Sequence, residues 1–211
     1  MKKMIRCRFL LTAVAMILAV TALTGAFAGT SVENGSWSGS GDSGLQAQLN
    51  SLPPFKFEKH KYGIGYGKCP IYTAPSESAY RSANGKATVA TDGYEVDDAG
   101  WVDGWLLVRY EIKTGWRVGY IPPKYVKGFQ SSMAPHFGYV PCVADDQIYV
   151  TDNPYSHTDS IGVLDEGEEF WVLSKYNYYA DKGYDWWYIE CYIDGQVARG
   201  FIDVSEAFHV E

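Results

Sequence analysis

Cysteine, histidine, cationic side chains and long hydrophobic runs are all scarce in this 211-residue sequence. Four cysteines and four histidines leave little material for a binuclear zinc or iron–sulfur site, and we predict no metal and no other cofactor. Lysine and arginine number 18 against 25 aspartates and glutamates, a net charge of −7, which disfavours nucleic acid as a partner. Hydrophobic residues make up 46% and aromatic residues 16% of the chain, so a disordered chain is also disfavoured.

Residues 1–28 have the pattern of a signal peptide. Four lysines and arginines within the first eight positions precede the apolar run 9–20, and Ala26 and Ala28 are the small residues that a signal peptidase reads. The run is shorter than the roughly 20 residues needed to span a bilayer. We therefore expect cleavage after Ala28 and a secreted or cell-wall-associated protein with no membrane contact. Cleavage leaves 14 cationic against 25 acidic side chains, a net charge of −11.

Residues 29–58 are expected to form a linker. The stretch 35–41 reads Gly-Ser-Trp-Ser-Gly-Ser-Gly, and we find no apolar periodicity before Asn50. Such a composition is typical of a flexible spacer. The segment either holds the folded part away from a surface or is a disordered terminus on which no function depends.

An internal repeat follows the linker. At an offset of 81 residues, 105–108 (WLLV) aligns with 186–189 (WWYI), and 119–121 (GYI) aligns with 200–202 (GFI). Turn residues fall at 113–115 in one copy and 194–196 in the other. Upstream, 71–72 resembles 148–149 at an offset of 77. The pattern predicts two homologous units, 59–128 and 137–211, that join between 128 and 136.

The fold class expected for each unit is all-β. Short runs rich in valine, isoleucine, tyrosine and tryptophan alternate with turn signals such as Asn84-Gly85 and Asp194-Gly195, and no long stretch has a helical period. Each unit has about 70 residues, and closing so small a sheet into a β-barrel hides its edges. We therefore predict two tandem small barrels.

Alternation assigns two faces to the best-defined strand of each unit. The outward face begins with Trp105 in the first unit and Trp186 in the second, and these rings need a reason to be exposed. The predicted core faces hold Leu106, Val108, Tyr110 and Ile112 in the first unit and Trp187, Ile189, Cys191 and Ile193 in the second. The predicted outward faces also hold Leu107, Arg109 and Glu111 in the first unit and Tyr188, Glu190 and Tyr192 in the second.

Three segments of each unit resemble one known family. The segments 104–108, 113–115 and 119–126, and their counterparts 185–189, 194–195 and 200–204, are similar to the late strand, hairpin and Gly-aromatic-Ile step of SH3-like barrels. The nearest resemblance is to bacterial SH3 (SH3b) domains, which occur in tandem on exported and often cell-wall-associated proteins. This resemblance implies two tandem SH3-like barrels after the signal peptide and linker.

The resemblance also implies binding residues. In peptide-binding members of the family, an outward tryptophan, a proline and a tyrosine line a groove for extended, proline-rich ligands. These positions correspond to Trp105, Pro122 and Tyr125 in the first unit, with Tyr72 as an early groove aromatic.

The second unit keeps fewer of these positions. Only Trp186 and Tyr149 carry over, because Asp203 replaces the proline and Glu206 replaces the tyrosine. If one unit binds a ligand in this mode, we expect it to be the first.

The predicted function is therefore that of an exported, non-catalytic binding module for cell-wall peptide, peptidoglycan or another extended peptide. The acidic residues Asp97, Asp98 and Asp103 either bind ligand amines or are solvated loop residues. The alternative is a structural or partner-binding protein of the cell envelope, whose aromatic faces are interfaces.

A cysteine peptidase is a less favoured third reading. It would pair Cys142 with His157 or His209. Beyond residue 28 the cysteines number three, Cys69, Cys142 and Cys191, so at least one thiol stays free or pairs between chains. Disulfides from Cys142 to Cys191 or from Cys69 to Cys142 stay open, as does their absence. The tyrosine-rich segment 175–179 serves either binding or packing.

Overall fold

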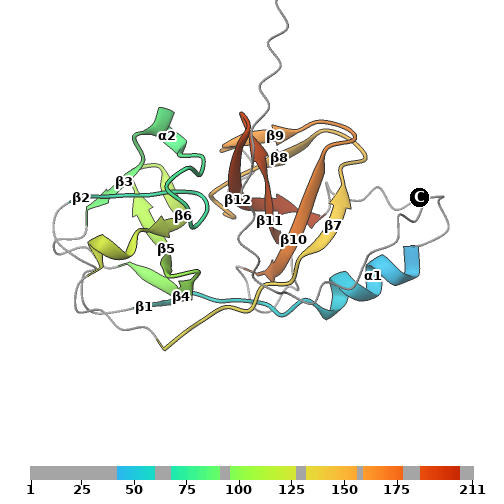
Figure 1. Ribbon diagram of the computed structural model, residues 1–211, viewed down its shortest axis with the longest axis horizontal. Coiled ribbons are helices and arrows are strands. Elements are labelled where there is room, and N and C mark those ends of the chain that lie inside the picture. The colour runs from blue at the N-terminus through green and yellow to red at the C-terminus, as the bar shows by residue number, and fades with distance from the viewer. Residues whose placement is uncertain are drawn as a thin grey trace, which may run out of the picture. The chain divides into compact units, whose positions relative to one another are not determined.

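The computed structural model describes residues 42–59, 68–90, 96–126, 132–155, 159–177 and 186–204, and strands dominate them (Figure 1). The all-β prediction is confirmed. The predicted signal peptide lies outside the described residues. No helix within the described ranges is long and apolar enough to cross a membrane.

The strands form two sets of six, here called the first and second repeats. The first contains β1 (Glu58–Lys59), β2 (Lys68–Pro70), β3 (Thr88–Ala90), β4 (Asp97–Val102), β5 (Trp105–Ile112) and β6 (Gly115–Ile121). The second contains β7 (Val140–Val143), β8 (Ile148–Val150), β9 (Gly162–Leu164), β10 (Glu169–Tyr176), β11 (Trp186–Ile193) and β12 (Gln196–Asp203). The short elements are α1 (Asp42–Ser51), α2 (Ser82–Gly85) and the 3₁₀ turn η1 (Pro123–Tyr125).

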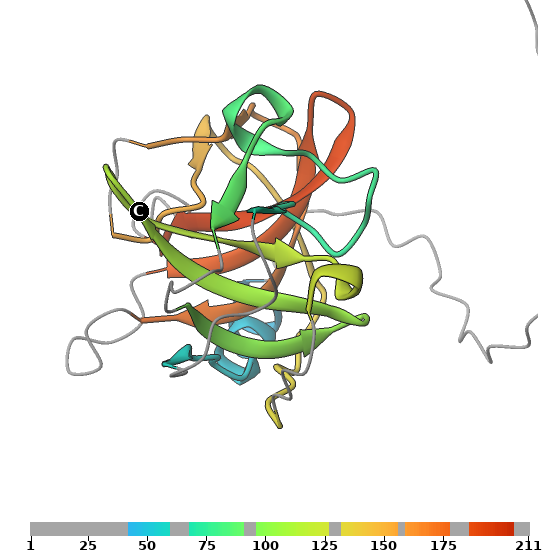
Figure 2. The ribbon, with the colours of Figure 1, turned by 90° about the vertical axis from the view of Figure 1, so that its left-hand side faces the viewer.

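The two repeats pair their strands in the same order. Antiparallel sheets run β1-β4-β5-β6 and β7-β10-β11-β12, each beside a small hairpin, β2-β3 or β8-β9. Both long sheets have a bulge at one place, between Asp98 and Gly100 in β4 and between Val172 and Ser174 in β10. Figure 2 shows the first repeat from its own side, with its green strands curving across the view. Among the described residues the strand pairs do not close into a ring, so the expected closed barrels are not found.

The structure corrects the alignment of the early strands. A bridge joins Tyr72 to Tyr120 in the first repeat, and the matching bridge joins Thr151 to Phe201 in the second. Because Tyr120 and Phe201 are 81 residues apart and equivalent, Thr151 is the counterpart of Tyr72. The offset here is 79 and not 77. Tyr149 therefore corresponds to Pro70, and it does not supply a second copy of the Tyr72 ring.

Two-residue turns close the central hairpins. Asp103 and Gly104 connect β4 to β5 with φ values of 50° and 78°, and Asp194 and Gly195 connect β11 to β12 with 51° and 73°. Positive φ at both positions gives a turn whose twist matches that of the paired strands. The turn predicted at Asp194-Gly195 is confirmed.

Helix α1 differs from the expected spacer. Residues 42–51 form a helix whose spacing brings Leu45 and Leu49 onto the apolar core of the second repeat, and Leu52 joins them just beyond the helix. This side of a helix is apolar at i, i+4 and i+7. Part of the predicted linker is thus packed against the second repeat and belongs to its core.

Each repeat has its own core on the predicted inward face. Leu106, Val108 and Tyr110 of β5 are buried with Cys69 and Ile71, as predicted. The prediction is wrong for the last position of that face, because Ile112 is 37% exposed near the end of β5. The matching core of the second repeat holds all four predicted β11 side chains: Trp187, Ile189, Cys191 and Ile193.

The outward faces of β5 and β11 pack into a third core, which the two repeats share. Leu107 and Tyr120 of the first repeat lie in one cluster with Trp186, Tyr188 and Phe201 of the second. The Tyr188 hydroxyl donates to the Tyr120 hydroxyl at 3.2 Å. Much of each outward face is therefore buried between the repeats, while Glu111 and Tyr192 near the strand ends stay exposed, and residues 39–211 form one compact unit.

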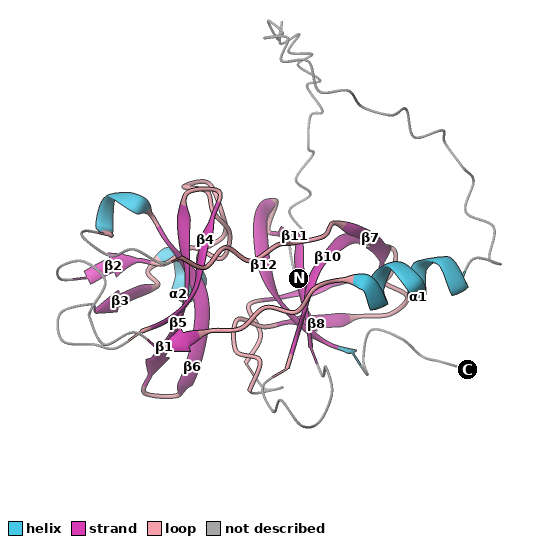
Figure 3. Ribbon diagram, turned by 90° about the horizontal axis from the view of Figure 1, so that it is seen from below, coloured by secondary structure: helices cyan, strands magenta, loops and turns pink. Residues whose placement is uncertain are grey.

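Extended segments before each repeat contact the other repeat or the shared core. The loop after α1 runs toward β1 (Figure 3), and on the way the Phe55 amide donates to the Lys175 carbonyl of β10 at 3.4 Å. The segment before β7 passes β4, where the Trp101 amide donates to the Met133 carbonyl at 3.0 Å. The rings of Phe55 and Phe137 meet edge to face at 5.8 Å inside the shared core. These contacts tie the two repeats together along the chain.

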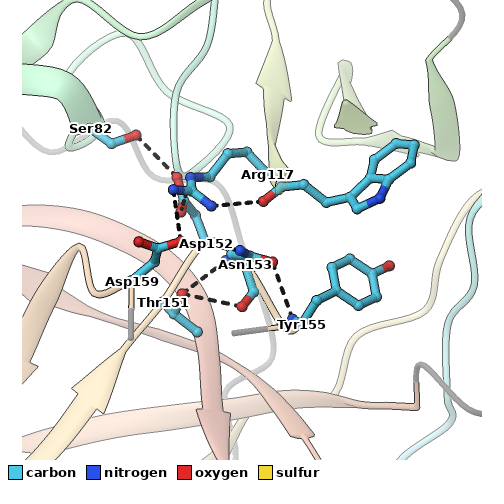
Figure 4. Close-up of polar contacts among 8 residues, drawn as sticks. Ser82, Arg117, Thr151, Asp152, Asn153, Tyr155 and Asp159 are labelled. Carbon is cyan, nitrogen blue, oxygen red and sulfur yellow. Dashed lines mark hydrogen bonds and ion pairs between the residues drawn. The ribbon is translucent and has the colours of Figure 1, made fainter. Parts of the chain in front are cut away.

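Arg117 joins the repeats through a polar cluster (Figure 4). Its guanidinium pairs with Asp152 at 3.2 Å and with Asp159 at 3.1 Å, both from the second repeat, and the Ser82 hydroxyl donates to Asp152 at 3.2 Å. Burial raises the pKa of Asp152 to about 6, against the opposite effect of Arg117. Asp152 is therefore still ionised at neutral pH and holds the ion pair.

Arg199 is the most deeply buried cation at the shared core. Its guanidinium donates hydrogen bonds to the Glu190 carboxylate at 2.8 Å, to the Tyr120 hydroxyl at 3.0 Å and to the Tyr139 hydroxyl at 2.9 Å. Burial opposes its charge, but Tyr120, Tyr188 and Glu190 hold the pKa of Arg199 above its usual range.

Replacing Arg199 by methionine is expected to destabilise the protein by about 3 to 5 kcal/mol, because Glu190 and Tyr120 lose a buried partner. Urea unfolding followed by circular dichroism measures the change. The matched control is Lys56→Met, which removes an exposed pair with Glu58 and is expected to cost at most about 1 kcal/mol. Equal effects of the two substitutions would contradict a supporting role for Arg199.

Candidate functional site

Two of the predicted groove rings meet on the first repeat. Tyr72 follows β2 and Trp105 opens β5, and their rings touch edge to face with centroids 5.2 Å apart. Both side chains are half-buried. The Arg81 guanidinium lies 4.9 Å from the centre of the Tyr72 ring on its face, where a cation is attracted by the ring. Arg81 and Trp105 together fix the Tyr72 ring while leaving part of it open to solvent.

The remaining predicted residues follow β6. Pro122 comes directly after Ile121, whose strand partner Leu106 follows Trp105, so the sheet places Pro122 beside Trp105. Pro122 is buried, and Tyr125 in η1 is half-buried against the core of the first repeat. We call the surface of Tyr72, Trp105, Pro122 and Tyr125 the aromatic face.

An exposed ion pair borders the aromatic face. Lys124 pairs with Glu77 at 2.6 Å, and its ammonium lies 5.6 Å from the Tyr125 ring centre. The hydrogen bond to Glu77 raises the pKa of Lys124. The pair is solvent-exposed, so a ligand can displace it at little cost.

The loop that carries Glu77 is held by the second repeat. The Tyr80 amide donates to the Val197 carbonyl at 2.9 Å, and the Gln196 amide side chain donates to the Ser78 carbonyl at 3.2 Å. Within the loop, the Thr73 hydroxyl donates to the Tyr80 carbonyl at 2.8 Å. The border of the aromatic face is therefore fixed before any ligand arrives.

The second repeat does not assemble an equivalent face. Trp186 is only 6% exposed, because it packs into the shared core. Tyr149 is 51% exposed but corresponds to Pro70, and Thr151 stands where the first repeat has Tyr72. Asp203 replaces the proline, and Glu206 lies outside the described residues. That the first unit is the better ligand site stays a prediction.

The candidate acidic residues divide into two kinds. Asp97 and Asp98 are buried in β4, and Asp97 pairs with Arg109. Only Asp103, in the β4–β5 turn, is well exposed. Tyr176, from the tyrosine-rich segment, lies in the shared core. These residues thus serve packing, with Asp103 as the exception.

Sequence reasoning missed Arg81 and Lys124. Lys124 lies between two predicted groove residues, Pro122 and Tyr125, so its position in the motif was an available signal. Arg81 gave no such signal, because its approach to Tyr72 depends on how the loop 73–82 folds back. The Arg81 guanidinium also donates to the Ile71 and Ala87 carbonyls, which lock it in place.

The three cysteines of the described residues are free and buried. Burial raises the pKa of the Cys142 thiol to about 11 and that of Cys191 to about 12, so both stay protonated at neutral pH. A protonated thiol is a poor nucleophile. His157 and His209 lie outside the described residues. Within the described ranges no group of three or more potential metal ligands is found.

Comparisons with known proteins give little similarity. No family model matches the chain, and no curated protein matches it. Among solved structures, the chain is similar to NlpC1 from Trichomonas vaginalis, with 13% identity and a TM-score of 0.25. The alignment covers 76% of this chain and 48% of that one, so this chain spans about half the length of its neighbour. Similarity this low supports no inference about fold or activity.

Proposed function

We propose that this protein is an exported, non-catalytic binding protein built from two SH3-like repeats. Its first repeat holds an extended peptide, such as a cell-wall peptide or peptidoglycan stem, against the aromatic face. The observation that carries the proposal is the pair of half-exposed rings, Tyr72 and Trp105, held 5.2 Å apart beside Pro122.

The geometry suits an extended ligand. Fixed aromatic ridges bind an extended chain by packing its rings and methylenes between them, and little ordering is needed when the ridges are already in place. Lys124 and Glu77 add one charge of each sign at the border. A peptide backbone with a free carboxylate or amine is then held at that border.

The non-catalytic part of the proposal draws support from the thiols. Cys142, the nucleophile of the peptidase reading, is buried and protonated, with its Sγ directed to the Val140 carbonyl at 3.7 Å. A cysteine peptidase needs an accessible thiolate beside an aligned base.

A second candidate function is favoured by one observation. Trp186, predicted as an outward groove ring, is buried between the repeats. This burial is what a structural or partner-binding protein of the envelope would show, because its aromatic faces serve as interfaces. In that case the second repeat is a scaffold for the first or for a partner.

A pull-down separates the two candidates. The protein is incubated with purified peptidoglycan stripped of teichoic acid and, in parallel, with an array of proline-rich peptides. We expect retention on at least one of these materials. Absence of retention on both would overturn the peptide-binding proposal and favour the structural one.

A further inference from the structure

Exposed apolar side chains gather on one surface of the second repeat. Five large hydrophobic side chains are exposed among the described residues, and three of them, Tyr139, Val143 and Tyr192, are 53 to 59% exposed on the same repeat. Large exposed apolar side chains that cluster mark interaction sites, whereas scattered ones are ordinary.

Strand register places the three on one sheet face. Side chains of β7, β10 and β11 that point away from the second repeat's own core form rows across the sheet, and Tyr139, two residues before Pro141, points to the same side, where its hydroxyl meets Arg199. One row contains Pro141, Trp171, Glu190 and Arg199. In the next row Val143 pairs with Glu169. Tyr192, two residues after Glu190 on β11, projects toward that second row. The surface, called the open face, consists of Tyr139, Pro141, Val143, Glu169, Trp171 and Tyr192.

The open face continues the sheet surface that forms the shared core. Tyr188 and Phe201, on the same face of β11 and β12, are covered by the first repeat. In the next row Arg199 is also buried and Trp171 packs partly against the shared core, whereas Val143, Glu169 and Tyr192 farther along the sheet stay exposed.

The corresponding surface of the first repeat is covered. Its equivalent row contains Asp97, Arg109 and Val118, and Tyr155 of the second repeat lies over it, with its hydroxyl 2.5 Å from Arg109. A ring from the second repeat thus covers this row of the first repeat.

The accessible charge of the open face is negative. Glu169 is exposed and makes no ion pair within the described residues, and Asp103 is exposed nearby, 4.0 Å from Arg199. Arg199 itself is 3% exposed and already bonded to Glu190. A second copy of this acidic chain would bring like charges together, whereas a cationic partner would be attracted.

The protein already packs a cation in such surroundings. The Arg109 guanidinium pairs with Asp97 and lies 5.0 Å from the Trp116 ring centre and 5.4 Å from that of Phe57. Rings with a carboxylate at their edge hold a guanidinium by cation–π attraction and an ion pair. The open face offers similar groups: Tyr192 and Glu169 are exposed, and Trp171 is half-buried against the shared core.

We propose that the open face binds a segment of a partner protein that carries lysine or arginine side chains. A cationic side chain brings its own donors to Glu169, and its methylenes cover Val143 and Pro141.

The test is a titration followed by nuclear magnetic resonance. The probes are a ten-residue peptide of alternating arginine and threonine, its lysine counterpart and its glutamate counterpart. We expect the cationic peptides to shift the Trp171 indole and Tyr192 amide signals, and added salt to weaken binding. Tyr192→Ser and Glu169→Gln are each expected to raise the dissociation constant about tenfold.

The matched control is Tyr149→Ser, which removes an equally exposed tyrosine from β8, outside both the aromatic face and the open face. This variant is expected to bind like the unaltered protein. Circular dichroism checks that each variant is folded. Binding that ignores Tyr192→Ser, equal binding of the glutamate peptide, or no shift at millimolar peptide would overturn the proposal. Self-association abolished by Tyr192→Ser would overturn it in favour of a second copy.

Discussion

Replacing Gly100 by alanine is expected to destabilise the protein by at least about 3 kcal/mol. Gly100 sits at the bulge of β4 with φ of +100°, a conformation that costs other residues about 1 to 3 kcal/mol. A Cβ there would lie 2.0 Å from the Met133 carbonyl oxygen. The segment 132–136 would have to leave β4 and give up the bond from Trp101 to Met133.

The control for Gly100→Ala separates strain from collision. Gly104 also has a positive φ, +78°, but nothing lies within 4 Å of a Cβ at that position. Gly104→Ala is therefore expected to cost only about 1 to 2 kcal/mol from the backbone. Urea unfolding of the two variants measures both losses of stability. Equal losses would show that the chain segment before the second repeat does not press on β4.

Replacing Trp105 by alanine is expected to weaken binding of a retained peptide by about 30-fold or more, because the ring is the central element of the aromatic face. Tyr72 would lose its edge-to-face neighbour, and the groove would lose one wall. The dissociation constant is measured by fluorescence or calorimetric titration with the peptide that the pull-down selects.

Two controls accompany Trp105→Ala. Trp116→Ala removes an equally half-exposed ring that packs on Arg109 and lies outside the aromatic face, so binding should be unchanged. Val108→Ala opens a cavity in the first repeat's core and should cost about 1 to 3 kcal/mol of stability. A Trp105→Ala variant that unfolds as readily as Val108→Ala, or that binds as well as Trp116→Ala, would contradict the assigned role of Trp105.

Local signals predicted the strands and turns of both repeats. The hairpin at Asp194-Gly195 and the inward faces around Val108 and Ile189 follow from alternation and turn chemistry, which act over a few residues. The all-β class follows from the same signals. These features needed no knowledge of distant contacts.

The packing between repeats could not be read from alternation alone. Alternation separates two faces but does not say whether the second face meets water or another sheet. Leu107 and Tyr188 on the outward face were a signal that both faces are covered, since a solvated face would be polar. Alternation therefore predicts a groove position for Trp186, whereas its ring packs in the shared core.

Helix α1 and the register of β8 were missed for related reasons. Leu45, Leu49 and Leu52 stand among polar residues, and their helix is stabilised mainly by its contact with the second repeat. The Ile-Tyr match at 71 and 148 favoured an offset of 77, whereas the bridges to Tyr120 and Phe201 fix 79. Short apolar matches do not determine register without the partner strand.

The most direct test of the aromatic face is to follow the chemical shifts of the assigned tryptophan indole signals and backbone amides by nuclear magnetic resonance during titration with the selected peptide. The account predicts that the Trp105 indole signal and the Tyr72 and Tyr125 amides shift, while the Trp186 indole, buried between the repeats, stays where it is. Shifts centred on Trp186 with Trp105 unmoved would contradict it, because the ligand would then bind at the second repeat or between the two.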